Sequence, residues 1–504
     1  MSFAGVEDRN AIEAEMPWAD RDVPKTLWSM LSETAGKFPS HDAISYQIFS
    51  GPKDHAETLS WSQLRGQVGR AANLFRSLGV GPTDVVAYVL PNCNETVITL
   101  LGGAVAGIAN PINPLLEAEQ IGSILRETNA KVVVTLRPFP KTDVAEKTAE
   151  AVKLAPNVTT VLEVDLCRYL TAPKSWIVPL IRPKLKVTNQ ATYKNFNSEI
   201  AKQSAELTFD DPQEDRVAFY FHTGGTTGMP KVAQHKYSGM VYNGWLGHTL
   251  LYTENDNIMC PLPLFHVFAC HVILMAAVKS GAHVVFPTPQ GYRGDGVFDN
   301  FWKLVERWKI TFIITVPTAI SAKMQRPINA DISTVKTAFS GSAPLPLELF
   351  RRFEKATGIT LIEGYGLTEA TCLVSSNPTD GVRKVGSIGI TFPYTDVKIV
   401  KSTSDGLVEA EVDEIGEIFS DVPSSEIARA GLQGDGTGVL DLFAEAGVCK
   451  SRGEARRSIE GGGLSINNVR VEHVEAVVRV DDAIEGRFLL LRKGKKNYHM
   501  VRVV

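Results

Sequence analysis

A run of glycine and threonine directly after a strongly apolar segment most constrains how this chain folds. Residues 216–221 read Arg-Val-Ala-Phe-Tyr-Phe, which predicts a buried strand. The strand leads into residues 223–231, which read Thr-Gly-Gly-Thr-Thr-Gly-Met-Pro-Lys. Glycines let backbone amides approach an anion closely, threonine hydroxyls add donors, and the lysine adds positive charge. We therefore predict a loop that binds a polyphosphate.

This loop differs from a Walker A loop. Lys231 follows Gly228 by three positions, Pro230 lies between them, and neither Ser nor Thr follows the lysine. The alternative interpretation is an ordinary surface turn rich in Gly and Thr.

Apolar segments rich in Val, Ile and Phe alternate with amphipathic segments along the chain. Predicted strands cover residues 84–90, 131–136, 282–287 and 310–316, and a predicted helix covers residues 61–78. This alternation predicts an α/β fold in which helices cover parallel sheets. A chain of 504 residues is also long enough for roughly three cores, at about 150 residues each.

The charge is unevenly distributed. A formal net charge of −4 excludes a general attraction of the whole molecule to nucleic acid or to an anionic membrane. Residues 450–504, however, hold 12 Lys and Arg against 7 Asp and Glu, so this part carries +5 and the rest carries −9. The C-terminal part is therefore a candidate for a separate partner.

The cysteines and the apolar segments indicate a cytoplasmic protein. The six cysteines are scattered without a Cys-x-x-Cys pair, which predicts buried thiols in a reducing compartment. The first 22 residues show no secretory signal pattern. The longest apolar run, residues 97–109, is too short to span a bilayer, so we expect no membrane span.

Four further motifs stand in a fixed order along the chain, one before residues 223–231 and three after them. Together with residues 223–231 they resemble the adenylate-forming superfamily, which includes acyl-CoA synthetases. The motifs are Asn110 to Pro114, Pro263 to His266, Gly341 to Leu345 and Gly364 to Glu369. The resemblance implies that residues 1–418 form a large N-terminal domain with two doubly wound sheets and a small β-barrel.

The resemblance also implies which residues bind the nucleotide. They are Thr223, Gly224, Gly225, Thr226, Thr227, Gly228, Gly341, Ser342, Ala343, Tyr365 and Gly366. On physical grounds, Tyr365 offers a flat face on which adenine can stack. The alternative for the two glycines of the Gly364 to Glu369 motif is a plain strand-to-helix turn.

The implied catalytic residues are Lys231, Thr368, Glu369 and His266, and the implied magnesium ligands are Glu369 and Thr226. The Thr368 hydroxyl can donate to the α-phosphate, and the Glu369 carboxylate is a hard ligand that suits Mg²⁺. The superfamily places a histidine at the position of His266 beside the carboxylate substrate. The alternative is a satisfied histidine in a half-buried loop.

The implied reaction is attack of a carboxylate on the α-phosphorus of ATP, which forms acyl-AMP and pyrophosphate, followed by transfer of the acyl group to coenzyme A. Charge that develops on the phosphates can be stabilised by amides, hydroxyls, Mg²⁺ and a lysine. Residues 265–275 and 312–318 are apolar, so we expect a fatty or aromatic acid.

The sequence departs from the superfamily after residue 418. The expected Tyr-x-Thr-Gly-Asp and Pro-Lys-Thr-x-x-Gly-Lys motifs are absent. Gly434-Asp435 lacks the preceding Tyr-x-Thr, and Pro140-Lys141-Thr142 lies in the wrong half of the chain. Because the superfamily's C-terminal domain supplies its main catalytic lysine, we expect impaired adenylation.

The C-terminal part resembles the S4-like RNA-binding domain of bacterial tyrosyl-tRNA synthetases. We expect a linker over residues 419–438 and a small α+β domain over residues 439–504. Within it, Ser451 and Glu454 form a capping box at the start of a short basic helix. A strand over residues 464–471 and a hairpin over residues 486–498 follow.

Basic residues of this domain are candidate contacts to structured RNA. They are Lys450, Arg452, Arg456, Arg457, Lys493, Lys495 and Lys496. The alternative is a solvated basic face. We find no His-Ile-Gly-His or Lys-Met-Ser-Lys signature, so tRNA charging is not expected.

Two functions remain open. The first is an acyl-CoA synthetase-like enzyme with impaired chemistry. The second is a catalytically inactive nucleotide-binding remnant fused to an RNA-binding module, as a natural fusion, an engineered chimera or an assembly artefact. The change of family near residue 418 favours the second.

Overall fold

The chain divides into two compact units, Met1–Tyr394 and Thr395–Val504. The computed structural model describes residues 3–223, 231–403, 406–410, 417–420, 426–427, 429–434, 436–449, 451–467, 469–483, 488–493 and 497–503. Within these residues, no helix is both long enough and apolar enough to cross a bilayer. Each unit is described by itself.

The first unit contains a seven-stranded sheet with the order β7-β6-β5-β3-β4-β8-β9. Its strands are β3 (Val85–Val89), β4 (Ile108–Pro111), β5 (Ala130–Leu136), β6 (Thr160–Val164), β7 (Thr192–Asn195), β8 (Val217–Thr223) and β9 (Lys231–Lys236). All neighbours are parallel except β8 and β9. The predicted strands over 84–90, 131–136 and 216–221 are confirmed.

The second sheet of this unit has nine strands, in the order β16-β15-β14-β13-β12-β10-β11-β1-β2. Its strands are β1 (Asp42–Gln47), β2 (Ala56–Ser60), β10 (Asn257–Met259), β11 (His283–Phe286), β12 (Phe312–Thr315), β13 (Thr337–Ser340), β14 (Thr360–Leu367), β15 (Cys372–Ser376) and β16 (Ile390–Thr391). The inner strands are parallel and the edge strands antiparallel. The predicted strands over 282–287 and 310–316 are confirmed.

Helices cover both sheets of the first unit. They are α1 (Val6–Glu15), α2 (Leu27–Lys37), α3 (Trp61–Ser77), α4 (Asn94–Ala106), α5 (Ala118–Glu127), α6 (Val144–Lys153), α7 (Lys174–Leu180), α8 (Phe196–Ile200), α9 (Tyr237–Leu250), α10 (Ala276–Ser280), α11 (Val297–Arg307), α12 (Pro317–Lys323) and α13 (Leu347–Thr357). The predicted helix over 61–78 is α3, which begins at a capping box between Ser60 and Gln63. Every residue of α4 is buried, since it packs against α3 and against strands of both sheets.

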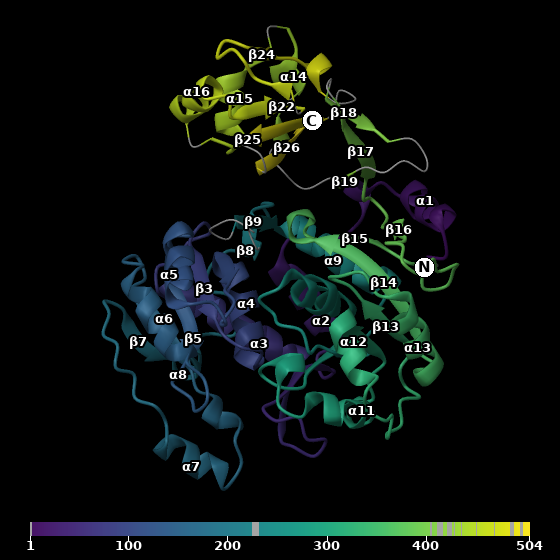
Figure 1. Ribbon diagram of the computed structural model, residues 1–504. Helices are drawn as coiled ribbons and strands as arrows, with labels where there is room; N and C mark the ends of the chain where they lie inside the picture. The colour runs from purple at the N-terminus through teal and green to yellow at the C-terminus, as the bar shows by residue number, and fades with distance from the viewer. Residues whose placement is uncertain are drawn as a thin grey trace. The chain divides into compact units, whose positions relative to one another are not determined.

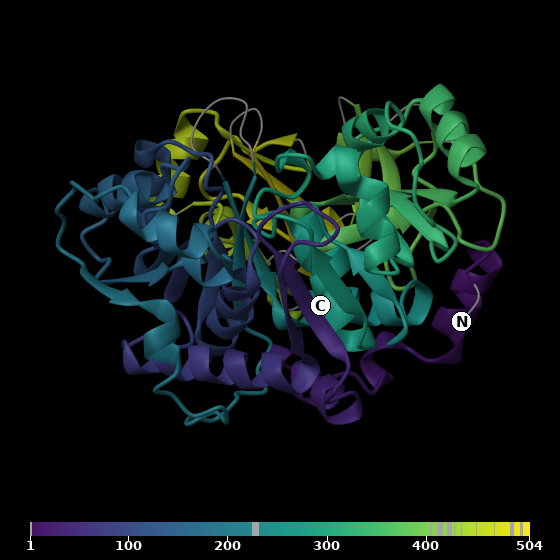
Figure 2. The same cartoon turned by 90° about the horizontal axis from the view of Figure 1, so that it is seen from below.

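The two sheets form two lobes of one core. In Figures 1 and 2 the blue segments of the seven-stranded sheet lie beside the teal and green segments of the nine-stranded sheet. A single cluster of buried apolar residues runs through both lobes. The expected α/β fold with two large, mostly parallel sheets is therefore confirmed.

The second unit has its own small core. Its helices are α14 (Arg429–Leu432), α15 (Val439–Glu445) and α16 (Arg452–Glu460). Its strands are β17 (Val397–Thr403), β18 (Gly406–Glu409), β19 (Glu417–Ser420), β20 (Glu426–Ile427), β21 (Thr437–Gly438), β22 (Leu464–Ile466), β23 (Val469–Arg470), β24 (Val477–Val478), β25 (Phe488–Lys493) and β26 (Asn497–Val503). Phe443 and Leu464 are fully buried in a cluster that is separate from the core of the first unit.

Three sheets organise the described part of the second unit. Their orders are β18-β17-β19, β20-β26-β25-β22-β23 and β21-β24. The predicted closing hairpin is β25 with β26, which pair antiparallel.

Two sequence predictions need comment here. The single strand expected over 464–471 is wrong, because β22 and β23 pair as a hairpin, and Asn467 adopts a left-handed φ of 50° that asparagine tolerates in turns. The predicted boundary at residue 418 falls inside β19, which pairs with β17. The division into 1–418, 419–438 and 439–504 stays a prediction.

Candidate functional site

A cavity of about 350 Å³ lies in the first unit, at the ends of β8, β13 and β14. β13 and β14 are parallel, with Ser340 opposite Glu363, so the residues that follow them meet at one edge of the sheet. Eight residues predicted from the sequence line this cavity: Thr223, His266, Gly341, Ser342, Tyr365, Gly366, Thr368 and Glu369.

The ends of the predicted phosphate loop meet in the β8–β9 hairpin. Thr223 at the end of β8 lies opposite Lys231, which begins β9 and is exposed. Gly224, Gly225, Thr226, Thr227 and Gly228 lie outside the described residues. Lys231 and the exposed Ala343 do not line the cavity.

Both glycines of the Gly364 to Glu369 motif lie within β14, and Thr368 and Glu369 begin the short 3₁₀ helix η5 (Thr368–Ala370) that follows the strand. Only glycine fits at position 366, because a Cβ there would lie 1.8 Å from the Cys372 carbonyl oxygen. Burial, and then the nearby Glu369 carboxylate, raise the pKa of Tyr365. Tyr365 and Glu369 therefore face the same cavity at short range.

A strained turn follows this motif. Thr371 and Cys372 have φ values of 51° and 89°, which side chains rarely adopt. Asn243 of α9 holds the turn: its Nδ2 donates to the Thr371 carbonyl over 2.7 Å, and its Oδ1 accepts from the Leu373 amide over 3.4 Å. Strain of this kind costs about 1–3 kcal/mol per residue and gathers at functional sites.

Two buried histidines form a hydrogen-bonded chain that ends at the Thr368 carbonyl. His235 Nε2 lies 2.7 Å from the Thr368 carbonyl oxygen, which can only accept, so Nε2 carries the proton. His235 Nδ1 then accepts from His271 Nε2 over 2.9 Å. Burial lowers the pKa of His235 to about 4 and that of His271 well below its ordinary value, so both are neutral.

Another buried histidine, His222, lines the cavity directly. Asn110 donates through Nδ2 to the Thr128 hydroxyl over 3.1 Å, so its Oδ1 accepts from His222 Nε2 over 2.7 Å. Burial lowers the pKa of His222 to about 4. Its Nδ1, a free acceptor in this tautomer, has no hydrogen-bond partner among the described residues. Asn110, a landmark in the sequence, thus orients a residue of the cavity wall.

His266 lies at the rim of an apolar wall. It is exposed, and its Nδ1 accepts from the Phe268 amide over 3.3 Å. It precedes the π-helix η3 (Phe268–Met275), a helix type that is frequent at functional sites. The apolar wall consists of Val267, Phe268, Val272, Phe339 and Leu373.

A buried lysine lies near the same strand ends. Lys323 of α12 is fully buried, and its Nζ donates to Thr315 Oγ1 over 2.9 Å and to the Tyr292 hydroxyl over 3.2 Å. Thr315 ends β12, opposite Ser340 of β13. Burial lowers the pKa of Lys323 to about 7.

None of these supporting residues was predicted from the sequence. His222 directly precedes the predicted loop and His235 follows it closely. Their short separation from Thr223 and Lys231 in the sequence could have indicated a place near the site. His271 and Lys323 carry no such signal, because each sits in an apolar or amphipathic segment that reads as core.

The second unit places some of the predicted RNA contacts in internal ion pairs. Arg452 pairs with Asp441, and Lys493 Nζ lies 2.7 Å from Glu454 Oε1. Arg456 and Arg457 are exposed on α16. Lys450, Lys495 and Lys496 lie outside the described residues. The Ser451 hydroxyl caps α16 as predicted, by accepting from the Glu454 amide over 3.3 Å.

Comparison with known families gives two matches. Residues 31–425 match the AMP-binding enzyme family. Residues 414–501 match the C-terminal domain of tyrosine–tRNA ligase. The two matches overlap over residues 414–425, around β19, so the change of family seen in the sequence is confirmed.

Curated relatives and solved structures agree with the first match. The marinolic acid–CoA ligase of Pseudoalteromonas sp. is 31% identical over 92% of this chain and 71% of its own length. The long-chain-fatty-acid–CoA ligase of Bacillus subtilis is 28% identical over 96% of this chain and 90% of its own length.

An anthranilate CoA ligase solved with anthranoyl-AMP has the same fold, with a TM-score of 0.66 and 22% identity over 81% of this chain and 71% of its own. MatB of Rhodopseudomonas palustris aligns with a TM-score of 0.64 and 22% identity over 79% of this chain and 70% of its own. With its acyl-CoA ligase-like, adenylate-forming architecture, the chain belongs to the AMP-binding enzyme family.

Proposed function

We propose that the first unit activates a carboxylic acid with ATP as an acyl-adenylate and pyrophosphate, and passes the acyl group to coenzyme A with release of AMP. The single observation that supports this most strongly is the convergence of Thr223, Tyr365, Thr368 and Glu369 on one cavity. Thr223 ends β8, whereas Tyr365 lies in β14 and Thr368 and Glu369 directly follow that strand, so the two groups are far apart in the sequence.

Each residue suits one part of the nucleotide. The Tyr365 ring offers a stacking face for adenine, and the Thr368 hydroxyl donates to the α-phosphate. Lys231 and the loop residues Thr223, Gly224, Gly225, Thr226, Thr227 and Gly228 bind the β- and γ-phosphates. Gly341, Ser342, Ala343 and Gly366 contact the base and the acyl group through the backbone.

The donor set fits Mg²⁺ only together with substrate phosphates. Among the described residues, no group of three or more His, Cys, Asp or Glu side chains could hold a metal ion. Mg²⁺ commonly binds through one or two carboxylates plus phosphate oxygens, so Glu369, with the Thr226 hydroxyl, suffices on the protein side. The ion supplies charge stabilisation for the leaving pyrophosphate.

The acid is proposed to be fatty or aromatic. The cavity wall below His266 is apolar, and a hydrocarbon substrate gains free energy from burial against such a wall. The name of one relative, a long-chain-fatty-acid–CoA ligase, agrees with a fatty acid. His266 would lie beside the reacting carboxylate.

The proposed chemistry is impaired because the C-terminal part belongs to another family. Residues 414–501 match a tyrosine–tRNA ligase domain, and the motifs that supply the superfamily's ribose contact and main lysine are absent from the sequence. Losing such contacts costs several kcal/mol of transition-state stabilisation, or roughly 10²-fold or more in rate. We also place the protein in the cytoplasm, in keeping with its six free cysteines.

Acid-dependent exchange of pyrophosphate into ATP tests this function. A panel of fatty and aromatic acids is offered with Mg²⁺, and Glu369→Gln is expected to lower the exchange at least about 100-fold. Glu348→Gln, which removes an exposed carboxylate on α13, is the matched control. Exchange that is equal in both variants would refute the assignment of Glu369.

A second candidate function follows from the C-terminal match. If no acid supports exchange, while calorimetry still detects binding of ATP with Mg²⁺, the first unit is a catalytically inactive nucleotide-binding remnant fused to an RNA-binding module. The exposed Arg456 and Arg457 on α16 favour binding of structured RNA by that module.

A mobility shift with structured RNA tests the module. The Arg456→Ala/Arg457→Ala variant is expected to weaken binding and to flatten its dependence on salt, because two phosphate contacts are lost. Arg351→Ala/Lys355→Ala, on an exposed face of α13, is the control. A shift that the α16 substitutions leave unchanged would contradict RNA binding by this face.

A further inference from the structure

Helix α7 (Lys174–Leu180) and Ile181 directly after it carry an unusually exposed group of large apolar side chains. The exposed fractions are 85% for Leu180, 71% for Trp176, 60% for Ile181 and 49% for Ile177. None of the helix residues is buried. Figure 1 shows α7 projecting away from the sheets of the first unit. Four large apolar side chains grouped on one short segment mark an interaction surface.

The same segment is strongly basic. From residue 166 to residue 198 the sequence contains no Asp or Glu, but it contains Arg168, Lys174, Arg182, Lys184, Lys186 and Lys194. Lys174, Lys184 and Lys186 are exposed. This local charge is opposite in sign to that of the whole chain, which is −4. A partner of complementary charge is therefore anionic.

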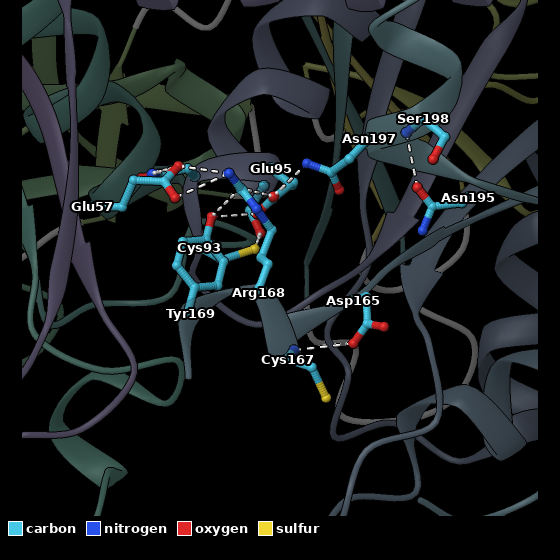
Figure 3. A network of polar contacts seen from close by, with 12 residues as sticks. Glu57, Cys93, Glu95, Asp165, Cys167, Arg168, Tyr169, Asn195, Asn197 and Ser198 are labelled. Atoms are coloured by element: carbon cyan, nitrogen blue, oxygen red, sulfur yellow. Dashed lines mark hydrogen bonds and ion pairs between the residues drawn. The ribbon is translucent and has the colours of Figure 1, made fainter. Parts of the chain in front are cut away.

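Polar contacts fix the chain on the N-terminal side of α7. Arg168 donates to Glu95 over 2.6 Å and to Glu57 over 3.0 Å, and the Tyr169 hydroxyl donates to Glu95 over 2.7 Å. Figure 3 shows Arg168 and Tyr169 directed at these carboxylates. Because the Glu95 side chain is fully buried at the start of α4, this anchor belongs to the rigid core.

A second set of contacts fixes the C-terminal side. Arg182 donates to both carboxylate oxygens of Asp165 over 2.8 Å and to the Pro138 carbonyl over 3.2 Å. The segment between the two anchors is thus held out from the core by buried or half-buried ion pairs. Its exposure is a built feature of the fold.

We propose that α7 and the basic residues after it, residues 174–186, dock the protein on the surface of an anionic phospholipid bilayer. Trp176, Ile177, Leu180 and Ile181 insert at the level of the headgroups, where tryptophan is enriched. Lys184 and Lys186 contact the lipid phosphates. The helix is too short to span the bilayer, so docking is peripheral.

Peripheral docking goes beyond the proposed acid activation and does not depend on it. An apolar acid partitions into bilayers because burying its chain there is favourable. A docked enzyme therefore meets such an acid at a high local concentration. Docking would nevertheless be detected with a catalytically inactive chain, so the two proposals fail separately.

Co-sedimentation with vesicles tests the proposal on the full chain. Vesicles of phosphatidylcholine with one third phosphatidylglycerol are compared with vesicles of phosphatidylcholine alone. We expect binding to the anionic vesicles, weaker binding to the neutral ones, and loss of binding at high salt. Absence of binding to anionic vesicles at low salt overturns the proposal.

Substitutions locate the contact. Trp176→Ser/Leu180→Ser is expected to lower the partition coefficient at least about tenfold. The matched control is Leu115→Ser/Val382→Ser, which removes two apolar side chains that are 58% and 80% exposed elsewhere in the first unit. Both pairs are exposed, so neither is expected to unfold the chain. Equal binding by the two double variants overturns the proposal.

Charge substitutions sharpen the result. Lys184→Gln/Lys186→Gln is expected to weaken binding to anionic vesicles about fivefold for each charge removed, whereas Arg351→Gln/Lys355→Gln on α13 leaves it unchanged. Analytical ultracentrifugation without lipid tests the alternative that α7 binds a second copy of the chain. A dimer that dissociates on Trp176→Ser/Leu180→Ser would assign α7 to a second copy of the chain and overturn membrane docking.

Discussion

In the first unit, ionisable side chains such as His235 and Lys323 are fully enclosed, whereas in the second unit Arg456 and Arg457 stand exposed on α16. The first arrangement fixes proton positions and donor directions around a cavity. The second leaves charge available to a large anionic partner. The difference indicates which measurement reports on each unit: pH for the first and salt for the second.

The chain itself allows the two units to be observed separately. All seven tryptophans lie before residue 309, and therefore in Met1–Tyr394. Tryptophan fluorescence during urea unfolding thus reports the free energy of unfolding of the first unit. Hydrogen exchange followed by mass spectrometry reports the second. Separate transitions matter, because one free energy does not describe a two-unit chain.

The largest expected effect is acid destabilisation of the first unit. Burial lowers the pKa of His222 and of His235 from 6.5 to about 4. Between these values the unfolded chain binds protons that the folded chain does not, so stability is lost as pH falls from 6.5 towards 4. The loss is about 1.4 kcal/mol per pH unit for each histidine, or roughly 3 for both. Urea unfolding at several pH values measures it.

The variant His222→Gln/His235→Gln should flatten this dependence by the same amount. Exposed His41→Gln is the control, since its side chain lies on the surface. If the pH dependence of the double variant equals that of the unsubstituted chain, His222 and His235 are not the cause, and the contrast between the units loses its main support.

The next largest effect is a change in the free energy of unfolding at alkaline pH, caused by Lys323. Burial lowers the pKa of Lys323 from 10.5 to about 7. Between pH 7 and 10.5 the unfolded lysine keeps a proton that the folded one lacks, so this group adds stability as pH rises, by about 1.4 kcal/mol per pH unit. Lys323→Met, of similar shape, should remove this contribution.

The comparison of Lys323→Met with the unsubstituted chain at pH 7 and pH 9 isolates the lysine from other groups that titrate there. Lys355→Met on exposed α13 serves as control. A difference between Lys323→Met and the unsubstituted chain that stays constant with pH would show that the amine is charged in the folded state.

The site residues that lie in contiguous motifs could be predicted from the sequence. Tyr365, Thr368 and Glu369 lie within one motif at the end of a strand, and strand ends of a parallel sheet meet at one edge. The apolar segments predicted strands of both sheets, whereas the expectation of two large sheets came from the resemblance to the adenylate-forming superfamily. Fold and cavity-lining residues were therefore largely accessible before any coordinates.

The residues behind the site were not accessible in this way. His235, His271 and Thr368 come from a strand, a π-helix and a turn, and only tertiary packing brings them into hydrogen-bond distance. Lys323 looks like an ordinary polar residue of an amphipathic helix, and its burial depends on how α12 packs on the sheet. A local pattern does not encode such partners.

A smaller effect is expected at Asn243, which holds the strained turn after the Gly364 to Glu369 motif. Asn243→Ala leaves the Thr371 carbonyl and the Leu373 amide without their partner, at a cost of about 2 kcal/mol. It should also weaken binding of ATP with Mg²⁺ in calorimetry, because the turn positions Glu369. Asn255→Ala, at an exposed position, is the control. Stability loss without weaker binding would limit Asn243 to a structural role.

The smallest effect is expected in the second unit. Arg452 pairs with Asp441, but 67% of its side chain is exposed, so water screens the interaction. Arg452→Gln should change the exchange protection of residues 452–466 by less than about 1 kcal/mol. A larger loss would show that this arginine is needed for folding and is not available to RNA. Because Lys493→Gln removes a half-buried pair with Glu454, it should destabilise the unit more than Arg452→Gln, and the order of the two variants therefore tests whether exposure sets the role of each cation.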